Sequence, residues 1–363
     1  MRLVFFNIVA ILSISASLLF AGDYDFQRNF AKKWHINEND VIVLENPIGS
    51  IHLTNTATEL GAFVNIRQTI FASFDELAQS RQMVMMVRIA DTRGPDTLFL
   101  RVQFPFHIHE KYCYPDMGGF FTSSIEGIWN GKKITVSPKG GAKLWSDIFL
   151  EIPAGHKVII KSIATTFIIE DYIGDIDFAT DHASAMTAGD IRGNLFLTSC
   201  HGALSVSKFE GELFYDGEDS DITFCDAIKG TVHAKSTTGD IIWNAKCDSV
   251  DLVEIESISG KIMFKGELAN FTHLINDEGD IEIEPTTHAI DSLVASVKSG
   301  DIELTMQENF AHDIIAMTEE GKVSHKLPVT EKCLIQATLK GTSGRVILLS
   351  TKGDIDINLK SIE

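Results

Sequence analysis

The sequence predicts an all-β protein dominated by a right-handed parallel β-solenoid, in which short strands wind into stacked coils. Three observations support this fold. The tripeptide Gly-Asp-Ile recurs between Gly174 and Ile357, the corner glycines from Gly239 onward are spaced by 21, 19, 21, 21 and 23 residues, and bulky apolar residues alternate after each glycine. The right hand follows from the general preference of parallel crossover connections.

The repeat defines coils of about twenty residues. Gly-Asp-Ile is intact at residues 174–176, 189–191, 239–241, 279–281, 300–302 and 353–355, and variants stand at 220–222, 260–262, 321–323 and 344–346. Glycine or serine also occurs at 193, 202, 211, 220, 230 and 239, at spacings of nine or ten residues. This half-period predicts at least two strands in each coil, with a corner between them.

The residues after each corner predict which side of the strand is buried. Alternate side chains of a strand lie on opposite faces, so the apolar set is expected to point inward. This set comprises Ile222, Phe224, Ile241, Trp243, Ile262, Phe264, Ile281, Ile283, Ile302, Leu304, Val346 and Leu348. Glycine at the corner permits backbone angles that other residues resist.

The aspartates of the repeat have two interpretations. Stacked acidic turns chelate calcium in some repeat proteins. Alternatively, aspartate beside glycine accepts hydrogen bonds from backbone N–H groups at the corner. Lys261, Lys322 and Arg345 interrupt the acidic run, and each coil offers only one dependable carboxylate. Both observations favour the hydrogen-bonding role.

Residues 1–21 resemble a secretory signal peptide. Arg2 gives a positive start, an apolar run extends from Leu3 to Phe20, and Ala21 is a small residue suited to cleavage. Elsewhere, the sequence has no stretch long and apolar enough for a membrane helix. We expect an exported mature chain without a transmembrane segment.

Residues 22–157 form a predicted β-rich N-terminal region, and residues 158–363 form the predicted solenoid domain. The N-terminal region has a first strand at 41–44, a short helix through about Arg81 with Ser73 and Glu76 as its capping box, and a hairpin of residues 83–90 and 97–104. A strand at 147–153 closes the region.

An aromatic insertion spans residues 104–142, and its part at residues 104–130 is the predicted contact surface, because exposed aromatic clusters usually mark interaction sites. Its candidate residues are Phe106, His107, His109, Tyr112, Tyr114, Phe120, Phe121 and Trp129. One alternative is that the rings pack as a small core or cap the first coil. A second is a metal site at His107 and His109, with Cys113 and Asp116 close behind.

Composition and motifs exclude several function classes. Fifty acidic and 31 basic residues give a net charge of −19, which argues against nucleic-acid binding. The chain has no GxSxG, HExxH or phosphate-binding glycine loop, so we predict no catalytic residues, cofactor or resident metal. Of five cysteines, Cys200, Cys225 and Cys247 are spaced about one coil apart, which allows either bridges between coils or buried free thiols.

The segment Ser146 to Ile191, in which Ser-Asp-Ile-Phe-Leu-Glu-Ile-Pro precedes the Gly-Asp-Ile units, resembles the bacterial "putative adhesin" family of β-strand-repeat proteins of unknown function. The corner Gly49-Ser50-Ile51 also fits that family. The resemblance implies a non-enzymatic protein of the periplasm, cell surface or extracellular space that binds an unidentified protein or glycan. The alternative is a β-helix protein that binds or degrades polysaccharides through outward-facing acidic residues.

Overall fold

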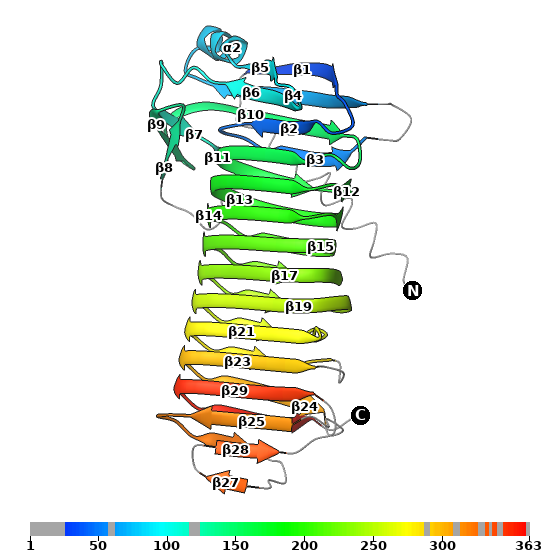
Figure 1. Cartoon of the computed structure of the whole chain (residues 1–363). Helices are drawn as coiled ribbons and strands as arrows, with labels where there is room; N and C mark the ends of the chain where they lie inside the picture. Colours follow the sequence, from blue (N-terminus) through cyan, green and yellow to red (C-terminus); the bar gives the residue numbers. More distant parts are fainter. Residues whose placement is uncertain are drawn as a thin grey trace, which may run out of the picture.

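The structure is a computed structural model that describes residues 26–56, 62–115, 124–286, 291–307, 313–325, 331–333, 336–339 and 344–360. These residues form 30 strands and one α-helix, and the strands wind into a stack of coils with two long walls (Figure 1). The expected signal peptide, together with Phe120 and Phe121, lies outside the described residues. None of the helices among the described residues is long and apolar enough to cross a membrane.

Wall 1 is the sheet that faces the viewer in Figure 1. Its parallel strands run from β6 to β25, with antiparallel strands added at both ends. In spatial order it contains β5 (Arg88–Arg93), β6 (Thr97–Gln103), β2 (Val41–Glu45), the first part of β11 (Val158–Ile169), the first part of β13 (Ile176–Arg192), β14 (Leu195–His201), the second parts of β15 (Leu204–Asp219), β17 (Ala227–Thr238) and β19 (Lys246–Ser259), then β21 (Phe271–Glu278), β23 (Ser292–Ser299), β29 (Arg345–Lys352), β25 (Asp313–Thr318), β28 (Gln336–Leu339) and β27 (Glu331–Cys333).

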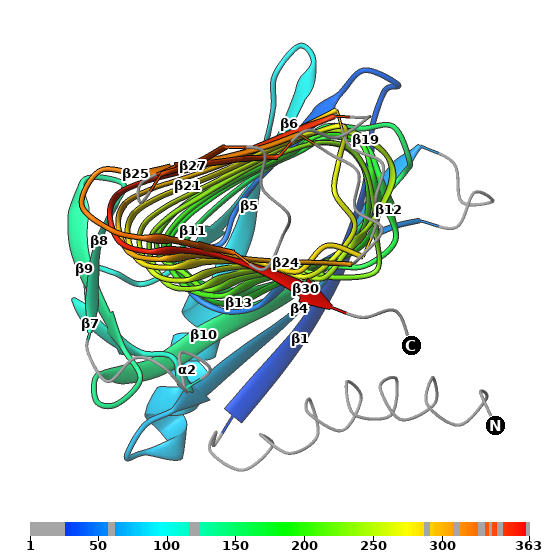
Figure 2. The ribbon, with the colours of Figure 1, turned by 90° about the horizontal axis from the view of Figure 1, so that it is seen from below.

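Wall 2 lies behind wall 1 and closes the coils. In spatial order it contains β1 (Phe26–His35), β4 (Phe63–Ser73), β10 (Ala142–Ile152), β3 (Ile51–Asn55), the second parts of β11 and β13, the first part of β15, then β16 (Ile222–Phe224), β18 (Ile241–Trp243), β20 (Ile262–Phe264), β22 (Ile281–Ile283), β24 (Ile302–Gln307), β30 (Ile355–Lys360) and β26 (Val323–His325). The short β12 (Tyr172–Ile173) pairs with the end of β13 at a corner. Figure 2 shows the coils superimposed along the axis of the stack.

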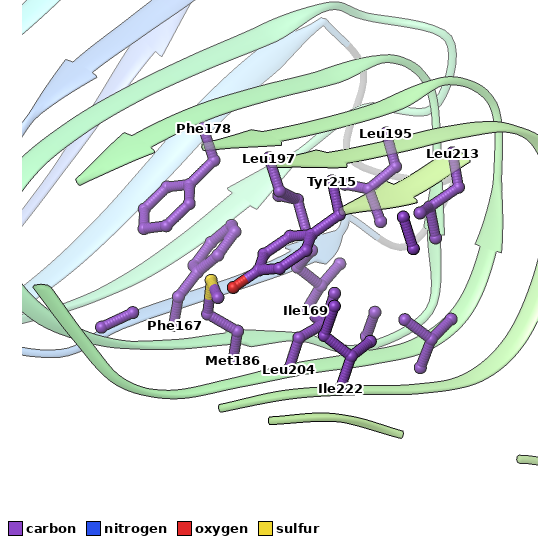
Figure 3. Packing of buried hydrophobic residues seen from close by; sticks show 14 of the residues in the cluster. Phe167, Ile169, Phe178, Met186, Leu195, Leu197, Leu204, Leu213, Tyr215 and Ile222 are labelled. Carbon is purple, nitrogen blue, oxygen red and sulfur yellow. The ribbon is translucent and has the colours of Figure 1, made fainter. Parts of the chain in front are cut away.

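The core lies between the walls, as the alternating pattern predicts. All twelve residues of the predicted inward set have no exposed surface. Aromatic rings stack from coil to coil: Trp243 lies 4.9 Å from Phe224 and 5.4 Å from Phe264 between ring centroids. Nearer the N-terminal end, Phe167 of wall 2 stacks on Phe178 of wall 1 across the core (Figure 3). The stacked parallel strands of the predicted solenoid are therefore confirmed, while its right-handed sense and its coil length stay predictions.

Both walls continue into the N-terminal region. β11 pairs with β2 in wall 1 and with β3 in wall 2, and all these strands contribute to one hydrophobic cluster. The predicted boundary between residues 157 and 158 is therefore a change in the sequence repeat. Both sheets continue across it without a break.

The N-terminal end of the stack is covered by α2 (Leu77–Met86), which buries Met83 and Val84. The helix begins and ends later than predicted. Glu76 stands at its N-cap without a side-chain hydrogen bond, and the Phe74 N–H donates to Ser80 Oγ instead. The expected hairpin is present as β5 and β6, but residues 83–86 belong to the helix. These corrections show that packing against the core, and not the capping pattern, positioned this helix.

The predicted aromatic insertion forms a small arm beside the stack (Figure 2). β7 (Lys111–Cys113), β8 (Ile125–Trp129) and β9 (Lys132–Ser137) join the start of β10 through β7. The arm packs closely on the coil corner, because a Cβ at Gly127 would lie 2.8 Å from Ile163 Cγ2.

The last coil in the sequence is not the last coil in space. β29 lies between β23 and β25, and β30 lies between β24 and β26. The chain therefore completes the terminal coil β25–β26 and the hairpin β27–β28, then returns to insert β29–β30 inside the stack (Figure 1).

The backbone geometry of the coil corners explains why glycine recurs there. In one column, a Cβ at Gly230 would stand 2.0 Å from the carbonyl oxygen of Gly211 in the preceding coil. The φ angle of Gly230 is 108°, which side chains rarely adopt. A second column at the other corner repeats this contact, with Gly260 above the carbonyl oxygen of Gly239 at 2.1 Å.

The corner aspartates connect neighbouring coils. Most of these carboxylates accept a hydrogen bond from the backbone N–H at the equivalent position of the next coil in space. Asp301 Oδ1 accepts from the Asp354 N–H at 2.7 Å, and Asp354 Oδ1 accepts from the Lys322 N–H at 2.8 Å. The same contact joins Asp221 to Asp240 and Asp240 to Lys261. The hydrogen-bonding role is thus present, although the donor lies on the adjacent coil and not in the same turn.

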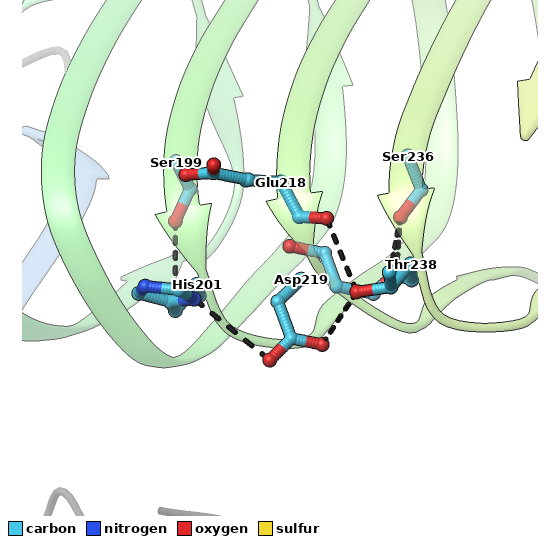
Figure 4. Close-up of polar contacts among 7 residues, drawn as sticks. Ser199, His201, Glu218, Asp219, Ser236 and Thr238 are labelled. Carbon is cyan, nitrogen blue, oxygen red and sulfur yellow. Dashed lines mark hydrogen bonds and ion pairs between the residues drawn. The ribbon is translucent and has the colours of Figure 1, made fainter. Parts of the chain in front are cut away.

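A third element of the repeat was missed in the sequence. Three residues before the corner, a buried Ser, Thr or Asn donates to a corner carbonyl group. Asn276 Nδ2 donates to Gly260 O at 2.6 Å, and Thr318 Oγ1 donates to Gly353 O at 2.8 Å. The same position is buried at Ser199, Ser236, Ser257, Asn276, Thr318 and Ser350. Ser199 Oγ donates instead to His201 O at 2.8 Å, and Ser257 Oγ has no hydrogen-bond partner among the described residues. Figure 4 shows Ser199 and Ser236, with Thr238 Oγ1 donating to Asp219 outside the corner.

We predict that Gly230→Ala lowers the free energy of unfolding by about 3 kcal/mol or more, because the added methyl meets a carbonyl oxygen at a strained φ. Gly94→Ala is the matched control, since its Cβ would make only ordinary contacts at 3.6 Å. Urea unfolding of both variants tests this. Equal stabilities would contradict the corner geometry.

We predict that Asp301→Ala costs about 1 kcal/mol of unfolding free energy through the lost acceptor, whereas Asp301→Asn retains most of it. Asn194 provides the precedent, because its Oδ1 accepts from the Glu212 N–H at 3.3 Å. Denaturant melts with and without a chelator measure both effects. If Asn is as harmful as Ala and chelation destabilises the parent chain, the calcium interpretation holds instead.

Candidate binding groove

The structure divides the eight predicted contact residues into three groups. Phe106, Tyr112, Tyr114 and Trp129 are buried, with at most 8% of their surface exposed. His107 is exposed and His109 is half-buried. The other two residues lie outside the described residues. The expectation that these rings form one exposed aromatic surface is therefore wrong for the four buried rings.

These four rings are buried because the arm packs against the stack. Tyr112 on β7 makes an edge contact with Phe106 at 5.2 Å between centroids, and burial raises the pKa of its hydroxyl. Tyr114 donates from its hydroxyl to Thr166 Oγ1 at 3.3 Å, which links the arm to β11. This cluster fits the alternative interpretation from the sequence, in which the rings pack as a small core or cap the first coil.

The two histidines line a groove between the start of α2 and the arm. The groove has a volume of about 860 Å³. Its walls are residues 73–75 and Gln79 on one side, residues 107–111 on the other, and residues 141–143 at the start of β10. A hollow of this size is within the range that holds small ligands or side chains of a partner.

His109 is fixed within this groove by two aromatic neighbours. Its ring lies 5.6 Å from Phe74 and 6.2 Å from Tyr112 between centroids. Its Nε2 atom is buried and has no hydrogen-bond partner among the described residues. Because a buried polar nitrogen without a partner is unfavourable, a ligand that offers a hydrogen bond here would be stabilised.

The groove presents charges of both signs. Asp75 and Glu110 contribute carboxylates, and Lys111 and Lys143 contribute ammonium groups, while Ile108 exposes 42% of its surface. Among the residues that the structure describes, no group of three His, Cys, Asp or Glu side chains is arranged to hold a metal ion. The arrangement suits a polar partner with apolar parts.

A second groove, which sequence reasoning missed, lies on the outer face of wall 2. Its volume is about 700 Å³, and Phe149 forms part of its floor. The Arg67 guanidinium covers this ring at 4.1 Å, and His52 contacts it at 4.6 Å between ring centroids. Since Arg67 and His52 already contact the Phe149 ring, this ring is less available for stacking on a sugar.

Cys225 and Cys247 are free thiols among the described side chains. A bridge between Cys225 and Cys247, which the coil spacing allowed, is therefore absent. Burial and the nearby Glu267 raise the pKa of Cys247 to about 12, so this thiol is a poor nucleophile near neutral pH.

Comparisons with known proteins identify the family. The Toastrack DUF4097 family model matches residues 148–358, which is more than half of the chain. A search of curated proteins found no match.

Solved structures are similar at low identity. A putative adhesin from Bacteroides fragilis NCTC 9343 is 14% identical, with 92% of this chain and 97% of that chain covered and a TM-score of 0.32. A putative adhesin from Parabacteroides merdae ATCC 43184 is 12% identical, with 93% and 97% covered and a TM-score of 0.36. A putative lipid binding protein from Parabacteroides distasonis ATCC 8503 is 12% identical, with 94% and 98% covered and a TM-score of 0.37. At these TM-scores the likenesses support no argument about function. The match over residues 148–358 shows that the chain belongs to the Toastrack DUF4097 family, a family of unknown function.

Proposed function

We propose that the chain is a non-enzymatic, exported envelope or surface protein that binds a protein or glycan at its N-terminal end. The observation that carries this proposal is the groove around His107 and His109, with its unpartnered buried Nε2 atom. The right-handed coils of about twenty residues would act as a spacer between this groove and the C-terminal end.

The shape of the molecule supports this division. The groove, α2 and the arm all lie at one end of the stack, and the described strands below them repeat one corner design (Figure 1). Export is supported by the signal-like residues 1–21.

The rival proposal is a polysaccharide-degrading enzyme that uses the outward aspartates. The structure gives several of these carboxylates a structural role, because Asp221, Asp240, Asp280, Asp301 and Asp354 all accept backbone N–H groups.

We predict that a glycan and protein array identifies a partner of the mature chain, and that His107→Ala together with His109→Ala weakens its binding at least tenfold, a loss of about 1.4 kcal/mol. His273→Ala on the outer face of β21 is the matched control, since it removes a half-buried histidine far from the groove along wall 1. If the control and the double variant bind equally, the contact lies elsewhere.

Catalysis is tested with the same protein. Incubation with acidic and neutral glycans should leave their chain length unchanged. Reproducible cleavage that disappears in Asp240→Asn would establish the rival enzyme and overturn the proposal.

A further inference from the structure

The outer face of wall 1 is a second, larger candidate interface. Its pattern of charged and apolar residues is complementary to the same face of a second copy. Its outward residues stand in register from strand to strand, because each parallel pair aligns equivalent positions. Several of its apolar side chains are uncovered: Phe196 exposes 37%, Phe214 43%, Ile275 38% and Met317 45% of their surface. Exposed apolar residues gathered on one flat face favour an interface.

Charges divide this face at its centre. On β17 the outward residues are His233 and Lys235, and on β19 the aligned residues are Glu254 and Glu256. His233 Nδ1 lies 2.8 Å from Glu254 Oε2, and Lys235 Nζ lies 3.4 Å from Glu256 Oε2. A basic stripe therefore lies directly beside an acidic stripe.

We propose that two copies of this chain associate face to face through wall 1, with their stacks antiparallel. The two-fold axis would run along the strand direction, between β17 and β19. This axis places His233 and Lys235 opposite the partner's Glu254 and the partner's Glu256. Each pair of stripes then meets its complement, which favours this register over displaced ones.

The same axis also aligns apolar residues. β14 lies opposite the partner's β23, so Phe196 meets the partner's Val294, and β11 lies opposite the partner's β25, so Ile159 meets the partner's Ile315. Both partner positions are half-buried and point outward. Three pairs are unfavourable: Asp216 meets the partner's Ile275, Asp177 meets the partner's Ile347, and Lys161 meets the partner's Met317. Aligned apolar pairs and the charged centre outweigh them in number.

The available area is sufficient for a stable dimer. Ten strands from β11 to β25, with five residues each, cover roughly 48 Å by 16 Å, or about 800 Å² per copy. Sheets in proteins pack face to face in this way at about 10 Å separation. This surface lies on the outer face of the stack, away from the groove of His109, so the two sites are independent.

The mass of the purified mature chain tests the proposal, measured by light scattering and sedimentation at physiological salt. We expect a dimer whose dissociation constant rises at least tenfold in Phe214→Glu. Met263→Glu is the matched control, because Met263 is half-buried and points outward from wall 2. Circular dichroism melts verify that each variant is folded.

Charge variants provide the decisive test. Lys235→Glu makes the central stripes acidic and Glu256→Lys makes them basic, so each variant alone should be monomeric. Mixing the two should restore a heterodimer, since every cross-copy pair is again complementary. The proposal is overturned if the chain stays monomeric up to about 100 µM, where even a micromolar dimer forms, if the dissociation constant of Phe214→Glu equals that of the parent chain, or if no heterodimer forms on mixing.

Discussion

The architecture depends on one steric constraint, the position of a carbonyl oxygen at each corner. When coils stack in register, the corner carbonyl group of one coil occupies the place of a side chain on the next, as Gly230 shows against Gly211. Glycine is then required by space as well as by φ. The carbonyl oxygen also needs a donor, which Asn276 and Thr318 supply from inside the core. The aspartate satisfies the neighbouring N–H group from outside, so one corner explains the whole repeat.

The sequence predicted the coil because this constraint leaves visible residues at a fixed period. The Ser, Thr or Asn before the corner was missed, since three residue types share one role and Gly217 and Val297 stand in two of its positions. At Gly217 the ring of Tyr215 fills the space, with its hydroxyl 2.7 Å from where a Cβ would stand. The stacking order could not be predicted either, because the corners at Gly321 and Gly353 carry the same signals although space and sequence order them differently.

The candidate site was predicted only in part. Local pattern located the histidines of residues 107–109, but the burial of Tyr112 and Trp129 depends on how the arm meets β11 and β13. That contact joins segments far apart in the sequence, where alternation within one strand carries no information. The groove itself needs α2, β10 and the arm together, so its shape follows from tertiary packing. Its chemical character, with two histidines and charges of both signs, can be predicted from the local sequence.

The inserted coil β29–β30 changes how the molecule would respond to force. In a stack built strictly in sequence order, tension on the C-terminus peels coils away one at a time from the end. Here the C-terminal strand β30 is held between β24 and β26, with parallel hydrogen bonds on both edges. Pulling must therefore break two rows of bonds in shear before any coil leaves, and the terminal coil loses its support at the same moment. Under tension, the C-terminal strand is therefore expected to detach from the stack abruptly rather than gradually.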